Sequence, residues 1–72
     1  MSETLYSTLN FNIEMIHKTK ADFSKTKVLE DYQVLRKRIV KEYRTGNITG
    51  SQVLDLMDKL NHYIDIDIWE RG

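Results

Sequence analysis

The sequence predicts an all-α fold: a small three-helix chain built on an antiparallel helical hairpin, with an extended C-terminal tail. No proline interrupts the 72 residues, and apolar residues recur at helical spacing along two long stretches. Gly46 and Thr49 are typical of a helix that ends and a helix that begins. We therefore expect helices near residues 3–18, 24–45 and 50–65 within one domain, residues 1–72.

The first segment fits two interpretations. As a helix it places four aliphatic residues on one face: Leu5, Leu9, Ile13 and Ile16. Tyr6 then lies at the edge of this face. As a strand it alternates apolar and polar residues from Leu9 to Met15. The helix leaves Phe11 and Met15 off the main apolar face, where they could contact another helix or subunit. We predict the helix; the alternative is a dimeric α+β fold in the order strand, helix, helix, strand.

The second helix is expected to begin near Ser24, a favourable N-cap residue. Its predicted core face consists of Val28, Leu29, Tyr32, Leu35, Ile39 and Tyr43. Charged residues cover the other side, with Val34 among them. After the turn at Gly46, Thr49 and Gln52 have the spacing of a capping box, which starts the third helix. A turn this short makes the second and third helices antiparallel neighbours.

The third helix is expected to end near residue 65. Its inner face holds Val53, Leu56, Met57, Leu60 and Ile64. One more turn of helix would drive Asp67 toward the core, and an unpaired buried carboxylate is costly. From Ile64 to Trp69 apolar and acidic residues alternate, which favours an extended segment with one covered face.

Composition narrows the functional classes. The chain has no cysteine, so it forms neither a disulfide nor a thiolate metal site, and its formal net charge is zero. Basic residues crowd the middle of the chain and acidic residues its end. No apolar run reaches the roughly 20 residues of a membrane span. We expect a cytoplasmic protein with no membrane contact, for which nucleic acid is an unlikely ligand.

Catalytic and ligand-binding motifs are not recognisable in the sequence. It lacks a nucleophile elbow and a glycine-rich phosphate loop. Asp58, His62 and Asp65 could share the outer face of the third helix, but this pattern is typical of a solvated surface rather than a metal site. His17 has no partner that spacing identifies. We expect no enzymatic activity, no cofactor and no metal.

Two short patterns resemble known families. As a strand, Asn10, Asn12 and Glu14 would resemble the base-reading ribbon of a ribbon-helix-helix repressor. The segment Ser51-Gln52-Val53-Leu54-Asp55 is similar at four of five positions to the Ser-Gln-Glu-Leu-Asp signature of the small aspartyl-phosphate phosphatases of the sporulation phosphorelay, and Leu35-Arg36 resembles their upstream arginine. This resemblance implies a phosphatase with Asp55 as its functional residue. When the hairpins are aligned by their turns, Asn61 takes that place instead.

The expected function is that of a small non-enzymatic regulatory or adaptor protein that binds another protein, with a homodimer possible. Apolar and aromatic residues left outside the core, together with basic residues of the second helix, are the candidate contact residues. They are Phe11, Met15, Val34, Arg38, Lys41, Ile66, Ile68 and Trp69. The repressor and the phosphatase are the alternatives.

Overall fold

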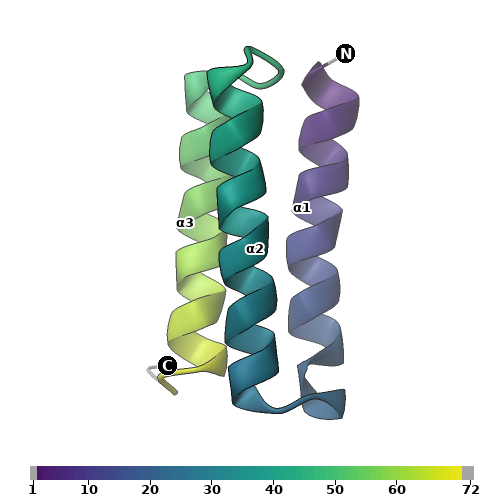
Figure 1. Cartoon of the computed structure of the whole chain (residues 1–72), viewed down its shortest axis with the longest axis vertical. Helices are drawn as coiled ribbons and strands as arrows, with labels where there is room; N and C mark the ends of the chain where they lie inside the picture. The colour runs from purple at the N-terminus through teal and green to yellow at the C-terminus, as the bar shows by residue number, and fades with distance from the viewer. Residues whose placement is uncertain (1, 71–72) are drawn as a thin grey trace.

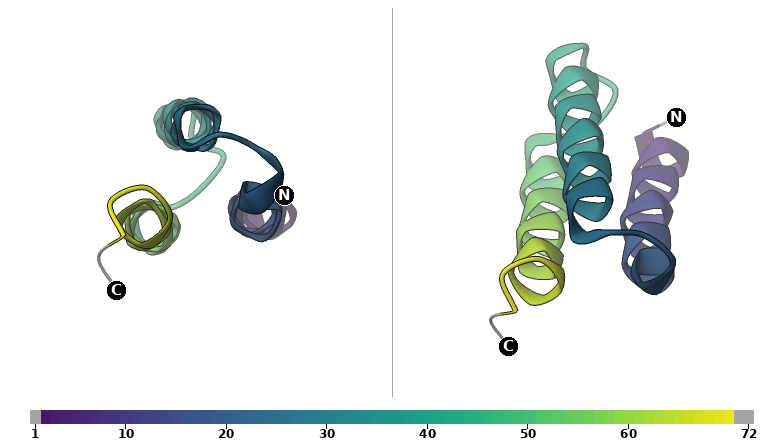
Figure 2. Two further views of the ribbon diagram at one scale, coloured as in Figure 1. Left: turned by 90° about the horizontal axis from the view of Figure 1, so that it is seen from below. Right: turned by 60° about the horizontal axis from the view of Figure 1, so that its bottom comes forward.

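The computed structural model describes residues 2–70, with the backbone only for residues 2 and 3, and shows a three-helix bundle (Figure 1). The elements are α1 (Ser2–Thr19), a short 3-10 helix η1 (Lys20–Asp22), α2 (Lys25–Arg44) and α3 (Gly50–Asp67). The α helices run down, up and down, and viewed along their axes they occupy the corners of a triangle (Figure 2). The all-α prediction is confirmed, and the described residues contain no strand. None of the described helices is both long and apolar enough to cross a membrane.

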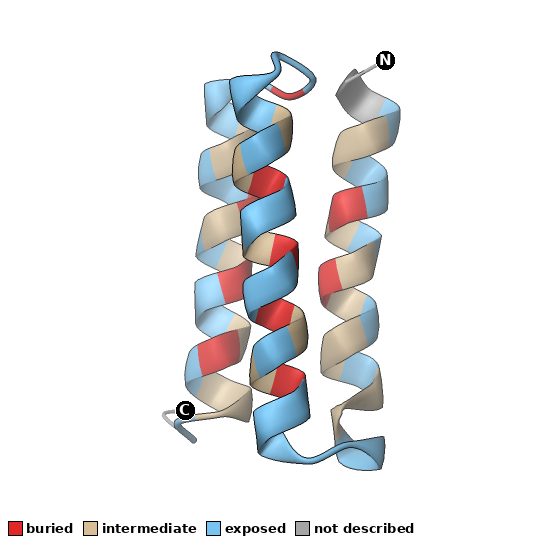
Figure 3. Ribbon diagram, in the orientation of Figure 1, coloured by how far each residue is buried: buried red, intermediate tan, exposed pale blue. Residues whose placement is uncertain are grey.

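The core lies along the axis of the bundle, where one stripe of each helix is buried (Figure 3). Its buried residues are Leu9, Ile13, Val28, Tyr32, Leu35, Ile39, Ile48, Leu56, Leu60 and Ile64. Nine of these ten lie on the predicted inner faces, and the tenth, Ile48, lies in the turn before α3. The other residues of the predicted faces, except Tyr43, are partly buried and pack against this core: Leu5, Ile16, Leu29, Val53 and Met57. Tyr43 is instead about half exposed, because it lies in the last turn of α2, at the end of the bundle beside the hairpin corner.

The predicted helix boundaries at the N-caps are confirmed. Ser24 precedes α2, and its side chain accepts a hydrogen bond from the Lys27 amide. Thr49 and Gln52 form the full capping box: the Thr49 hydroxyl accepts from the Gln52 amide at 3.2 Å, and the Gln52 side-chain oxygen accepts from the Thr49 amide at 2.9 Å. Gly46 has a φ of 80°, a conformation that disfavours other residues. The hairpin corner is therefore specified by local chemistry.

The C-terminal end of α3 differs from the prediction. The helix continues through Asp67, so the extended segment expected from Ile64 onward is wrong for residues 64–67. The Ile68 amide still bonds to the Ile64 carbonyl at 2.9 Å, and only then does the chain leave the helix. The reason is that the Asp67 carboxylate does turn inward, as helical geometry requires, but it is not unpaired there.

Candidate functional site

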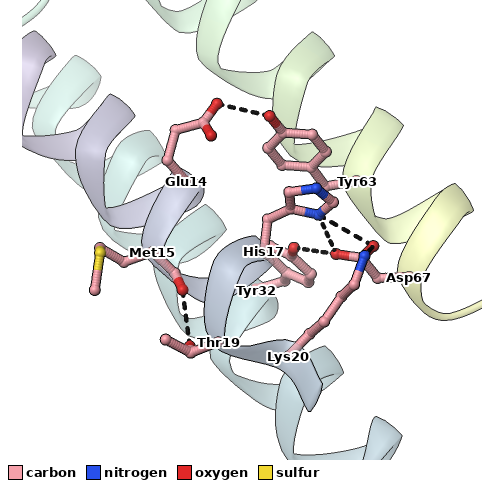
Figure 4. A network of polar contacts seen from close by, with 8 residues as sticks. All are labelled: Glu14, Met15, His17, Thr19, Lys20, Tyr32, Tyr63 and Asp67. Carbon is pink, nitrogen blue, oxygen red and sulfur yellow. Dashed lines mark hydrogen bonds and ion pairs between the residues drawn. The ribbon is translucent and has the colours of Figure 1, made fainter. Parts of the chain in front are cut away.

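A buried carboxylate joins all three helices near the end of the bundle that holds the C-terminus. The Asp67 side chain has no exposed surface. It accepts hydrogen bonds from Nδ1 of His17 at 2.9 and 3.1 Å, from Nζ of Lys20 at 2.8 Å and from the hydroxyl of Tyr32 at 2.6 Å (Figure 4). Because α1 contributes His17, η1 contributes Lys20 and α2 contributes Tyr32, this one carboxylate links the end of α3 to every other element.

The pKa of Asp67 reflects two opposing effects. Burial raises it, whereas the ion pair with Lys20 and the hydrogen bonds from Tyr32 and His17 lower it, and the net result lies below the ordinary value. The carboxylate therefore remains charged at neutral pH. Burial, followed by the hydrogen bond to this charge, strongly raises the pKa of Tyr32, so the phenol stays a donor.

A second polar group continues this cluster along α1 and α3. The His17 ring stacks on the Tyr63 ring with centroids 4.1 Å apart and planes 5° from parallel. The Tyr63 hydroxyl donates to Glu14 at 2.6 Å, which raises the pKa of Tyr63 to about 12. Glu14 also pairs with Lys59. The bonds from Lys59 and Tyr63 lower the pKa of Glu14.

The polar cluster holds the bundle together. In the described part of the chain every buried side-chain nitrogen and oxygen has a hydrogen-bond partner, so the cluster carries no unsatisfied group that would call for a ligand. Its members do not line the three grooves described below. Among residues 4–70, whose side chains the structure describes, no three His, Asp or Glu residues gather as metal ligands would, and this includes Asp58, His62 and Asp65.

The best candidate for a functional site is a groove along the outer seam between α1 and α2. We call it the α1/α2 groove. It has a volume of about 360 Å³, and its lining is mostly apolar: Asn12, Met15, Ile16, Asp31, Val34, Leu35 and Arg38. Met15 is 40% exposed and Val34 62% exposed. Phe11, one helical turn before Met15 on α1, is 60% exposed.

Three of the eight residues predicted to bind a protein thus meet in one groove, and Phe11 lies on the same helix one turn away. Met15 comes from α1, whereas Val34 and Arg38 come from α2. The sequence pattern alone does not show that these residues are neighbours. Val34 is not an isolated surface aliphatic, because Met15 and Leu35 line the same groove.

The other four predicted residues lie elsewhere. Trp69 is 58% exposed and lines a separate groove between α2 and α3, together with Arg36 and Asn61. Ile68 is partly buried and packs against the core, and Ile66 is also partly buried. Lys41 lines a third groove, whose lining residues all come from the second half of α2 and the residue after it. The structure therefore separates the apolar C-terminal residues from the α1/α2 groove.

The second half of α2 carries uncompensated positive charge. Its exposed basic residues are Lys37, Arg38, Lys41 and Arg44, and none takes part in an ion pair among the described residues. By contrast Asp31, at the other end of the α1/α2 groove, is paired with Lys27 at 2.9 Å. The rim of the groove is therefore neutral near Asp31 and positive from Arg38 toward the end of α2.

Sequence reasoning missed the polar cluster. It considered Asp67 only as an unpaired charge and left His17 without a partner. The available signal was the spacing of Asp67, which follows Leu60 and Ile64 by seven and three residues and so shares their buried face. A buried acid at that position needs donors, and His17, Lys20 and Tyr32 are donors on the segments predicted to pack against it.

The residues that carry the two family resemblances are not arranged as those families require. Asp55 accepts a hydrogen bond from Tyr6, whereas Arg36 donates to Asn61, so the two residues of the phosphatase pattern do not act on each other. Asn10, Asn12 and Glu14 lie on helix α1, and the described residues contain no ribbon that could present them to DNA.

Comparisons of the chain with protein-family models, with curated proteins and with solved structures give no match.

Proposed function

We propose that this chain is a small non-enzymatic regulatory or adaptor protein that binds another protein through the α1/α2 groove. The observation that carries the proposal is the exposure of Met15 and Val34 side by side in one groove, with Phe11 one turn away. Single exposed apolar residues are ordinary on a protein surface, whereas a contiguous apolar patch with a polar rim marks an interaction site.

The residue types support the same conclusion. Methionine and aromatic side chains are enriched in protein interfaces, where methionine adapts to the shape of its partner. Burial of about 200 Å² of apolar surface from these three side chains would contribute about 5 kcal/mol before the costs of association.

The groove is presented on a rigid support. Asp67 ties the ends of α1, α2 and α3 together, and the capping box fixes the opposite corner. A preformed groove loses little conformational entropy when a partner binds. The proposal includes a cytoplasmic partner. The chain has no cysteine and so forms no disulfide, the bond that an oxidising compartment would maintain.

Affinity capture from native lysate tests the proposal with matched variants. Val34→Glu places a charge in the groove, and Leu54→Glu places the same charge at the 68% exposed Leu54 on α3, which does not line the groove. Both positions are exposed, so circular dichroism should show equal helix content and nearly equal melting temperatures.

We expect one protein to be captured by the wild type and by Leu54→Glu but not by Val34→Glu. A partner retained equally by both variants would contradict the α1/α2 groove as the binding site. If Val34→Glu captures every protein that the wild type captures, the proposed function itself is contradicted.

A further inference from the structure

We infer that the partner presents an amphipathic helix with acidic residues along one edge, and that this helix lies in the α1/α2 groove as a fourth helix of the bundle. The inference rests on the proposed function and adds the chemistry of the partner. It depends on the shape of the groove and on its distribution of charge.

The shape of the groove fits a helix. It follows the seam between two antiparallel helices, with Ile16 and Leu35 partly or fully buried beneath Met15 and Val34. A fourth helix packs into such a seam with apolar residues spaced at i, i+3, i+4 and i+7.

The charges beside the groove indicate which edge of the docked helix carries acidic residues. The residues of α1 that line it, Asn12, Met15 and Ile16, are uncharged. On the α2 side Arg38 lines the groove. Lys41, three residues later, lies just outside this lining, in the groove along the second half of α2. Neither is ion-paired within the described residues. A docked helix therefore faces positive charge along one edge only, which acidic residues on that edge would complement.

A second copy of this chain does not offer such a helix. Its α3 carries the exposed acids Asp58 and Asp65, but the apolar face of α3, with Leu56, Leu60 and Ile64, is buried in the core of its own bundle. This favours an acidic helix of another protein over a second copy. Asp31 in the groove and a net charge of zero disfavour an anionic lipid surface or nucleic acid.

Fluorescence anisotropy with two designed peptides tests the inference. Each labelled peptide has about 18 residues, or five helical turns, with leucine at the core-facing positions and alanine elsewhere. One carries glutamate along one edge, and its twin carries lysine at the same positions. The protein variants are Arg38→Glu/Lys41→Glu and, as a control with the same change of net charge, Lys37→Glu/Arg44→Glu, which leaves Arg38 in the groove unchanged.

We expect the wild type to bind the acidic peptide about tenfold more tightly than the basic twin, the ratio that two partly exposed charge pairs supply. The Arg38→Glu/Lys41→Glu variant should reverse this preference, and the control variant should keep it. Addition of salt should reduce the preference, because rim charges are screened.

Several outcomes would overturn the inference. One is equal affinity for the two peptides or no binding of the acidic one. Another is loss of the preference in both double variants, since long-range charge would then suffice. Sedimentation of the wild type as a dimer that Val34→Glu dissociates would assign the groove to a second copy. Arg38-dependent binding to phosphatidylglycerol vesicles or to duplex DNA, with no peptide binding, would assign it to those ligands.

The two proposals fail in different ways. If a lysate protein is captured through Val34 but Arg38→Glu/Lys41→Glu captures it equally well, the proposed function stands and the acidic helix is wrong. If no Val34-dependent partner is captured, the proposed function is wrong whatever the peptides do.

Discussion

Substitution of Asp67 by asparagine should destabilise the bundle by about 2 kcal/mol. The carboxylate accepts from His17 and Tyr32, and a hydrogen bond to a charged group contributes about 1.5 to 3 kcal/mol. Asparagine keeps one acceptor oxygen of nearly the same shape, so about half of that contribution should survive. The ion pair with Lys20 adds little, because the Lys20 side chain is 41% exposed.

Thermal unfolding followed by circular dichroism measures this loss. For a chain of this size, about 2 kcal/mol corresponds to a fall in melting temperature of about 8 to 16 °C. The control is Asp65→Asn, which removes the same charge from an exposed residue of the same helix and should change stability by less than about 0.5 kcal/mol. If Asp67→Asn melts within a degree or two of Asp65→Asn, then the buried carboxylate does not hold the three helices together and the reasoning is refuted.

Four further predictions concern the same cluster and the hairpin corner. Because the pKa of Asp67 is lowered in the folded state, its contribution is present above pH 4 or so and lost as the pH falls below that value, so the wild type and Asp67→Asn should converge in stability in acid. Because the pKa of Tyr63 is raised to about 12, the unfolded chain loses that proton first; stability should fall between about pH 10 and 12, and less so in Tyr63→Phe. Gly46→Ala should lower the free energy of unfolding by about 1 kcal/mol through the positive φ alone, since no atom crowds that position. Gly50→Ala, in the first turn of α3, would make only ordinary van der Waals contacts and should leave the free energy of unfolding unchanged or slightly higher. Urea unfolding measures both. Thr49→Ala should cost about 1 kcal/mol and Thr49→Ser much less, because serine retains the capping oxygen; equal losses would contradict the capping role.

Local signals predicted the hairpin well. The cap at Ser24, the turn at Gly46 and the capping box of Thr49 and Gln52 depend on residues within a few positions of one another, and each appears in the structure as expected. The core faces followed from the 3.6-residue period for the same reason.

The end of α3 could not be predicted from local signals. Whether the helix runs past Asp65 depends on whether the Asp67 carboxylate finds donors, and those donors come from segments 35 to 50 residues away in the sequence. The alternation from Ile64 to Trp69 suggested an extended chain, but three tertiary hydrogen-bond partners outweighed that pattern. A buried charge is destabilising or stabilising according to its partners, which periodicity does not reveal.

The sequence predicted that several candidate binding residues are exposed, but not which of them share a site. Exposure of Phe11, Met15 and Val34 followed from their positions off the core faces. Their common location required the packing of α1 against α2, and the same packing separated them from Trp69 on the α2/α3 side.

Amide chemical-shift mapping shows directly whether the partner binds in the α1/α2 groove. The ¹⁵N-labelled chain is titrated with the captured partner or, in its place, the acidic peptide. We expect the largest shifts on Asn12, Met15, Val34 and Arg38, which line the groove. Shifts concentrated instead on Gln33, Asn61 and Trp69 would place the partner in the groove between α2 and α3 and would contradict binding in the α1/α2 groove.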